Sequence, residues 1–335
     1  MPLAQQHWVI YDTDPGVDDA MALYYALASP QIKVLGITTV FGNVTVAQAT
    51  TNALYLTHLT GQPQHGAIPI AQGAAAPLAK HTEAPPDYIH GKDGLGNQPS
   101  RSTNPTPRAP ETRSAAQFIV DMARRYPGQI TLVPVGPLTN IALALQLEPL
   151  LPKLVKNVVL MGGTVTEPGN VSPVAEANIW NDPHAADQVF TAGFALTMVG
   201  LDATHKMLLP VTLFEQVAQA HKHPATDALL HAVRFYANFY GSRFVHQSGF
   251  EGCFGHDVLA FVYLTHPQFF TTETGPIRVV TEGIAQGQTV LQRQAFMQYP
   301  QAGWGASMPV SSACMTLDAA AAKEALETAL LGPWL

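Results

Sequence analysis

The stretch that most constrains this chain lies near its start, where a buried strand meets a buried helix across an acidic turn. Residues 8–11 form a continuous apolar run typical of a buried strand. Residues 20–28 are apolar on nearly every side, which predicts a buried helix. Between them, residues 12–19 read Asp-Thr-Asp-Pro-Gly-Val-Asp-Asp. This order predicts an α/β fold with carboxylates at the carboxyl end of a strand, where ligands bind in open α/β sheets.

The carboxylates of this turn predict a cation site. They are Asp12, Asp14, Asp18 and Asp19, and no Lys or Arg precedes Lys33. Acids this close do not all stay ionised unless a cation joins them, and oxygen ligands suit Ca²⁺ or Mg²⁺. The alternative is structural, with Asp14 as a helix N-cap and the later pair favoured by the helix dipole. Four acids around a Pro-Gly turn favour a metal or catalytic site.

Strand and helix patterns alternate downstream, which predicts a mostly parallel central sheet with helices on both faces. Residues 32–40 form a β-branched strand, and residues 45–59 a helix. We see no repeat or composition shift, so residues 1–335 are expected to form a single domain. Further strands are expected at 130–135, 157–161 and 195–200, the last of these ending the core, with β-rich pieces at 277–281 and 289–294 and helices at 114–125, 182–191 and 319–331.

Two segments interrupt the alternation. Residues 72–112 hold seven prolines between Pro77 and Pro110. Because the alternation resumes afterwards, we interpret this stretch as a lid or rim over the site. Residues 211–264 are mainly helical and carry an aromatic stripe between Phe235 and Phe244. Such a stripe is usually core, but its far end could form one wall of a pocket for a planar ligand.

Composition excludes several classes of partner. The net charge of −7 argues against nucleic acid and anionic membranes, and fits an uncharged substrate better than a polyphosphate. Two cysteines do not make a disulfide framework, which is typical of an intracellular protein. Neither a signal-peptide pattern nor an apolar run of ~20 residues is evident, so we expect a soluble, cytoplasmic protein.

Five motifs resemble, in order, those of the Ca²⁺-dependent nucleoside hydrolases. They are Asp12–Ala20, Val135–Ala142, Met161–Gly163, Ala175–Asn178 and His256-Asp257. The resemblance implies an open Rossmann-like fold with the active site at the carboxyl ends of the strands. It also implies hydrolysis of the N-glycosidic bond of ribonucleosides to ribose and free nucleobase in nucleoside salvage, by a homodimer or homotetramer.

The resemblance further implies a role for each matching residue. Ca²⁺ would be held by the carboxylates of Asp14, Asp19 and Asp257 and by the backbone carbonyl of Val135. Asp18 would be the general base, Asp12 would support the metal carboxylates, and His256 would face the nucleobase. The ribose hydroxyls would be held by Asn43, Asn170, Glu176 and Asn178, with Met161 near the sugar and His90 near the substrate. Tyr240 and Phe244 are candidates for stacking on the base.

Several alternatives stay open at this point. His256 is either the leaving-group acid or only packs against the base, and His90 is either a substrate contact or an ordinary loop residue. The preferred base is either a pyrimidine or any of several bases. A haloacid-dehalogenase-like phosphatase would need a hydroxyl residue where Pro15 and Gly16 stand. A non-catalytic Ca²⁺ or nucleoside-binding protein would have the site but lack the general base, yet Asp18 is present.

Overall fold

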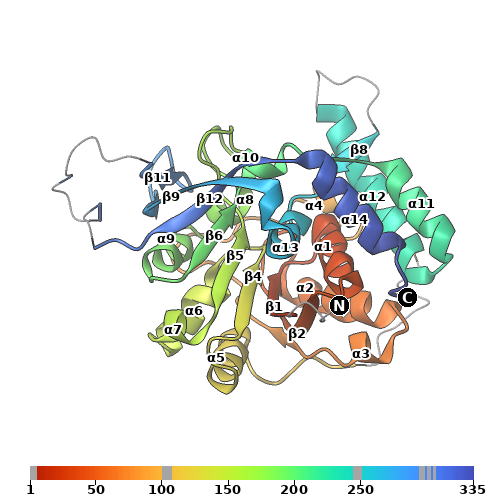
Figure 1. Ribbon diagram of the computed structural model, residues 1–335, viewed down its shortest axis with the longest axis horizontal. Helices are drawn as coiled ribbons and strands as arrows, with labels where there is room; N and C mark the ends of the chain where they lie inside the picture. The colour runs from red at the N-terminus through yellow and green to blue at the C-terminus, as the bar shows by residue number, and fades with distance from the viewer. Residues whose placement is uncertain (1–5, 100–107, 244–250, 294–298, 300–302, 305–306) are drawn as a thin grey trace.

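The computed structural model describes residues 6–99, 108–243, 251–293, 299, 303–304 and 307–335. Within them the chain forms one central sheet of eight strands in the order β3-β2-β1-β4-β5-β6-β12-β9 (Figure 1). Neighbouring strands are parallel except β9, which is antiparallel to β12. The strands are β1 (His7–Thr13), β2 (Ile32–Thr39), β3 (Ile70–Gln72), β4 (Ile130–Pro134), β5 (Asn157–Met161), β6 (Leu196–Val199), β9 (Phe270–Gly275) and β12 (Ser311–Leu317).

The strand order places a crevice between β1 and β4. The first six strands follow the doubly wound order 3-2-1-4-5-6, and the direction of winding reverses at β1. In the register of this pair, Asp12 lies beside Pro134, so the acidic turn and Val135 leave the sheet side by side. Ligands of open α/β sheets bind outside the carboxyl ends of the strands at such a reversal. The expected mostly parallel α/β fold is confirmed.

Helices cover both faces of the sheet, as expected. Successive residues of β1 point to opposite sides, so Val9 and Tyr11 join one apolar core and Ile10 the other. The first core packs under α1 (Val17–Ala28), α2 (Val46–Leu59), α11 (Val211–His221), α12 (Pro224–Arg243), α13 (Val258–Thr265) and α14 (Ala319–Leu331). The second packs under α5 (Ala115–Arg125), α6 (Thr139–Leu147), α7 (Leu151–Leu154) and α9 (Pro183–Thr191) (Figure 1).

Short elements complete the fold. They are α3 (Pro63–Gly66), α4 (Asp87–His90), α8 (Ala177–Asn181), α10 (Leu201–Thr204), the 3-10 turn η2 (Pro267–Phe269), and two small sheets that pair β7 (Leu208–Pro210) with β8 (Gly252–Phe254) and β10 (Ile277–Val279) with β11 (Thr289–Leu291). None of the described helices combines the length and the apolar character needed to cross a bilayer.

The expected end of the core at residues 195–200 is wrong. Strand β12 pairs in parallel with β6, and β9 then extends the sheet further. The reason is local composition, because β12 reads Ser-Ser-Ala-Cys-Met-Thr-Leu and has one β-branched residue. The expected β-rich pieces at 277–281 and 289–294 pair with each other in the β10–β11 hairpin, outside the central sheet.

The irregular stretch after β3 follows the carboxyl edge of the sheet. The Ala74 amide donates to Asn140 Oδ1 at 2.9 Å, and the Leu78 amide donates to Asp182 Oδ2 at 2.9 Å. Further on, α4 packs against α12. The described part of residues 72–112 is therefore fastened to α6, α9 and α12, which favours a rim over a hinged lid.

We expect Asp182→Ala to lower the free energy of unfolding by about 2–4 kcal/mol. The buried Asp182 carboxylate caps α9 and accepts hydrogen bonds from Thr139 Oγ1 at 2.7 Å, Leu78 N at 2.9 Å and Ala185 N at 3.0 Å. Asp318→Ala is the matched control, because exposed Asp318 caps α14 through Ala321 N and should cost about 1 kcal/mol. Equal losses in urea unfolding would contradict this account.

Candidate active site

The acidic turn is held in one shape by hydrogen bonds to its own backbone and to the loop after β2. The Asp19 carboxylate accepts from Thr13 Oγ1 at 2.5 Å, Gly16 N at 2.8 Å and Asn43 Nδ2 at 3.0 Å. Asp14 Oδ2 accepts from the Asn43 amide at 2.6 Å. Asn43 therefore fixes two of the expected metal ligands at once.

Glycines enclose Asp14 because no side chain fits beside it. A Cβ at Gly136, after β4, would lie 2.5 Å from Asp14 Oδ1, and a Cβ at Gly42, after β2, would collide with Asp14 Oδ2. A Cβ at Gly16 would lie 2.6 Å from His90 Nδ1. The backbone of two loops and the His90 side chain thus close around the acidic turn, which explains the glycines there.

A buried carboxylate cluster lies at the crevice between β1 and β4. One oxygen from each of Asp18, Asp19 and Asp257 lies within 4.8 Å of the other two, and all three residues are buried. Asp257 comes from the start of α13, so the cluster joins distant parts of the sequence. Asp14 Oδ1 and Asp18 Oδ1 are buried without a hydrogen-bond partner among the described residues.

The electrostatics of the cluster fit a cation. Burial raises the pKa of each of its carboxyls, and repulsion from neighbouring aspartates raises the pKa values of Asp14, Asp18 and Asp257 further. A hard cation relieves both penalties, and carboxylate oxygens are its preferred protein ligands. The oxygens that lack a partner point to the same conclusion, so the residues present fit a divalent cation.

A second group of polar side chains lies on the β4 and β5 side of the crevice. Asn178 Nδ2 donates to the Val135 carbonyl at 2.8 Å and to the Met161 carbonyl at 3.2 Å. The buried Glu176 carboxylate accepts from the amides of Gly163 at 2.9 Å and Asn178 at 2.8 Å. Burial raises the pKa of Glu176 to about 7. These contacts bring together four of the residues expected near the metal and the sugar.

Histidines and tyrosines close the site on the side of α12. His256 Nδ1 lies 2.8 Å from Thr204 Oγ1, and its Nε2 lies 3.2 Å from the Tyr240 hydroxyl. The Tyr240 hydroxyl lies 3.1 Å from that of Tyr236. A hydrogen bond from Tyr236 reaches the Asp18 carboxylate and partly lowers the pKa that burial has raised. A continuous line of polar groups therefore joins Asp18 to His256.

His90, the last residue of α4, contacts the start of α1. Its Nδ1 accepts from the Val17 amide at 3.2 Å, so Nε2 carries the proton, and its ring stacks on Tyr236 with centroids 5.1 Å apart. Burial lowers the pKa of His90 to about 3. Burial, followed by repulsion from His205 and His90, lowers the pKa of His256 to about 3. Both rings are neutral at physiological pH.

Of the other expected residues, Asn170 lies apart from this cluster, Asp12 bonds to neighbouring elements, and Phe244 cannot be placed. Asn170 is exposed, and its Oδ1 accepts from the Ala177 amide at 3.0 Å instead of facing the buried groups. Asp12 bonds to Thr38 Oγ1 at 2.5 Å and Asn140 Nδ2 at 2.7 Å, so it braces β1 against β2 and α6. Phe244 lies outside the described residues.

Sequence reasoning missed three residues of the site. Tyr236 belongs to the aromatic stripe, which is usually core, yet it contacts both Asp18 and His90. Thr204 follows β6, and its position after a strand was the available signal. Thr13 lies inside the acidic motif, but its bond to Asp19 depends on the turn geometry.

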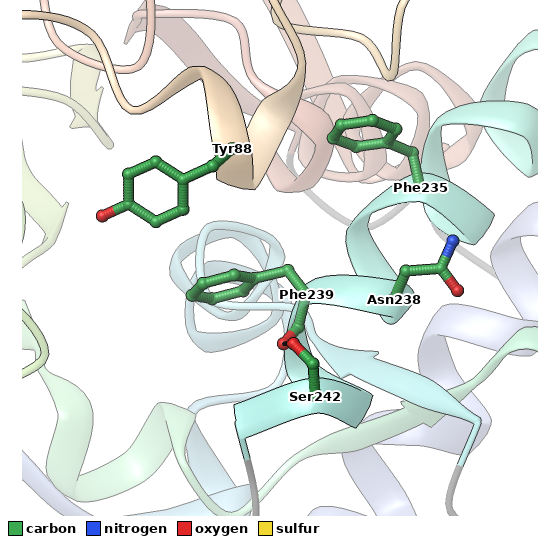
Figure 2. A pocket seen from close by; sticks show the side chains of 5 residues that line it. All are labelled: Tyr88, Phe235, Asn238, Phe239 and Ser242. Carbon is green, nitrogen blue, oxygen red and sulfur yellow. Dashed lines mark hydrogen bonds between the residues drawn. The ribbon is translucent and has the colours of Figure 1, made fainter.

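An aromatic pocket lies beside the site, on the neighbouring face of α12. It has a volume of about 320 Å³ and is lined by Tyr88, Phe235, Asn238, Phe239 and Ser242 (Figure 2). Tyr88 comes from α4, and the other lining residues come from α12. The Phe239 ring contacts that of Tyr240 at 5.1 Å, so this pocket adjoins the site but does not contain the carboxylate cluster.

The sequence matches known proteins over most of its length. The family model described as inosine-uridine preferring nucleoside hydrolase matches residues 9–324. Uridine nucleosidase 1 of Arabidopsis thaliana is 37% identical over 99% of this chain and 95% of its own length. The pyrimidine-specific ribonucleoside hydrolase RihA of Shewanella woodyi is 36% identical, over 85% of this chain and 88% of its own.

The fold comparison agrees. The solved structure of the plant nucleoside hydrolase PpNRh1 superposes with a TM-score of 0.89 at 34% identity, covering 98% of this chain and 99% of that one. Sequence and fold therefore match over nearly the whole chain, and the carboxylate crevice lies where such a fold binds ligands. The chain belongs to the inosine-uridine preferring nucleoside hydrolases, a family of enzymes that hydrolyse N-glycosidic bonds.

Proposed function

We propose that this protein hydrolyses ribonucleosides to ribose and free nucleobase, with a preference for pyrimidines or a broad specificity, in nucleoside salvage. The observation that carries the proposal is Asp18, whose buried Oδ1 has no hydrogen-bond partner among the described residues. Asp18 lies beside Asp19 and Asp257 and is hydrogen-bonded to Tyr236, which leads through Tyr240 to His256. A general base placed between a cation site and a site for the leaving nucleobase suits hydrolysis of an N-glycosidic bond.

The proposed cation is Ca²⁺, held by the carboxylates of Asp14, Asp19 and Asp257 and by the Val135 carbonyl. A hard cation held there would make a nearby water more acidic and would help to orient the ribose diol. Asp18 then accepts the proton of the attacking water at Oδ1, while Tyr236 holds the carboxylate in place. Support comes from the raised pKa values and the unpartnered oxygens described above.

The sugar is proposed to lie against Glu176, Asn178, Asn43 and Met161. Backbone amides orient both oxygens of Glu176, and Asn178 is fixed by two carbonyls, so these groups stay in place as the sugar flattens. The oxocarbenium-like sugar formed when a glycosidic bond breaks is positively charged, which a buried carboxylate stabilises. Asn170 lies at the exposed rim, so its contact with the sugar stays a prediction.

Departure of the base is assigned to the α12 side of the site. His256 is hydrogen-bonded through both ring nitrogens, and the Tyr240 hydroxyl is its partner at Nε2. Neutral His90 carries its proton on Nε2, which makes it a second donor for a carbonyl oxygen of the base. The names of the uridine nucleosidase and of the pyrimidine-specific hydrolase among the relatives support a pyrimidine as the leaving group.

The test is base release from uridine, cytidine, inosine, adenosine and 2′-deoxyuridine by the Ca²⁺-loaded enzyme. We expect kcat/KM for 2′-deoxyuridine to be lower than for uridine by about 10²-fold or more, because the missing hydroxyl leaves buried polar partners unpaired. Uridine 5′-monophosphate is the control for a phosphatase, and release of phosphate without base would overturn the proposal. So would folded, loaded enzyme that releases no base from any nucleoside.

The oligomeric state, the location and the excluded partners stay predictions. We expect a homodimer or homotetramer in the cytoplasm. We also expect no nucleic-acid or membrane partner, which the net charge of −7 supports. Light scattering on the purified enzyme measures the first of these directly.

A further inference from the structure

The carboxamide of Asn52 joins two loops of the site. Asn52 is fully buried in α2, and its Nδ2 donates to the Pro15 carbonyl at 2.7 Å and to the Asp93 carbonyl at 2.9 Å. Pro15 lies in the acidic turn, and Asp93 follows α4, which ends at His90. One amide nitrogen therefore fastens the cation turn to the loop that carries the histidine.

The two loops are also in direct contact at this point. A Cβ at Gly94 would lie 2.9 Å from the Pro15 carbonyl and 2.8 Å from Asn52 Nδ2. On the other side of the turn, His90 Nδ1 accepts from the Val17 amide at 3.2 Å. The distance between the acidic turn and His90 is thus set by two hydrogen-bonded contacts, of which Asn52 forms one.

The loop after His90 is stiff enough to transmit this restraint. The Asp93 carboxylate accepts from the amides of Leu95 at 2.9 Å, Asn97 at 2.8 Å and Gln98 at 2.8 Å. Gln98 Nε2 donates to the Ala228 carbonyl of α12 at 2.6 Å. The Asp93 carboxylate thus holds the loop together, and Gln98 ties it to α12.

We propose that Asn52 is a positioning residue for the hydrolysis proposed above, on which this inference rests. It fixes the spacing between the carboxylates that activate water and the side of the site that His90 and α12 form. Asn52 lies under the loops and acts through Pro15 and Asp93, whose carbonyls it holds.

The test is Asn52→Asp, which keeps the shape of the side chain and replaces its two N–H donors by at most one O–H donor for the two carbonyls. We expect kcat for uridine to fall about 10²-fold, the scale of a misplacement near 1 Å, with a much smaller change in KM. Thr57→Val is the matched control on the same helix, because the buried Thr57 hydroxyl bonds only within α2, to the Ala53 and Leu54 carbonyls, among the described residues. Full activity of Asn52→Asp would overturn the proposal.

A double-mutant cycle separates positioning from general destabilisation. If Asn52 acts through His90, Asn52→Asp should change kcat less than about twofold in a His90→Ala background, because coupled residues are not additive. Independent, multiplicative losses would contradict the inference.

Nitrogen-15 spectra of the His90 imidazole give a readout that needs no turnover. The His90 signals, assigned with His90→Ala, should shift in Asn52→Asp and stay unchanged in Thr57→Val. Unchanged His90 signals in Asn52→Asp would overturn the inference. If the wild-type enzyme released no base while the signals shifted as expected, the proposed function would fail and the positioning contact would stand.

Discussion

Replacing Asp18 with Asn is expected to lower kcat for uridine by about 10³-fold, within the range typical of a general base. The amide keeps the size of the carboxylate and its place beside Tyr236, but it cannot accept a proton from water. Asp18 is outside the proposed ligand set of Asp14, Asp19, Asp257 and Val135, so Ca²⁺ binding should persist. Calorimetric titration and base release, measured on the same preparation, test both statements.

The same substitution should make the metal-free protein more stable. Repulsion from Asp18 raises the pKa values of Asp257 and Asp14, so removing its charge relieves that repulsion. A rise in Tm of Asp18→Asn in chelator, together with the loss of activity, would distinguish a catalytic base from a structural acid. Asp121→Asn, on α5 beside Arg113, is the control and should leave kcat unchanged. Retention of a tenth or more of the wild-type kcat by Asp18→Asn would rule out the assigned role.

Local signals explain what the sequence could predict. Thr45, Ser114 and Asp182 each accept a backbone amide at the start of a helix, which is why α2, α5 and α9 begin close to where expected. Asp14 and the Val135 carbonyl follow β1 and β4, whose carboxyl ends meet at one edge because the two strands are parallel. Asp257 instead precedes α13, after a strand of a separate small sheet.

Tertiary contacts explain what the sequence could not predict. Strand β12 lacks a strong strand pattern and is fixed by pairing with β6 and β9. Tyr236 reads as core because aromatic residues at helical spacing usually are, and its bond to Asp18 depends on how α12 crosses α1. Asn52 is an ordinary polar residue of a helix until the loops that it joins are placed around it.

Chelation of the metal is expected to lower kcat/KM for uridine by about 10³-fold, equivalent to about 4 kcal/mol of transition-state stabilisation, with recovery on adding Ca²⁺.

Chelation should also make the stability of the protein strongly dependent on pH. Burial raises the pKa values of Asp12 and Glu176 to about 7, and those of Asp14, Asp18 and Asp257 are raised as well. The metal-free native state therefore holds more protons than the unfolded chain between about pH 4 and pH 7.

The stability of the metal-free protein should change with pH in the opposite direction to that of a protein stabilised by a salt-bridged acid. Because the native state binds the extra protons, the stability of the chelated enzyme should fall as the pH rises from 5 to 7.5. Ca²⁺ competes with those protons, so its affinity should rise over the same range, and Ca²⁺ at 100 times its Kd should add about 2.7 kcal/mol. Thermal unfolding with and without chelator measures both effects. Asp19→Asn, which removes a proposed ligand, should weaken the response to Ca²⁺, and a chelated enzyme that keeps its activity or gains stability with pH would contradict the cation site.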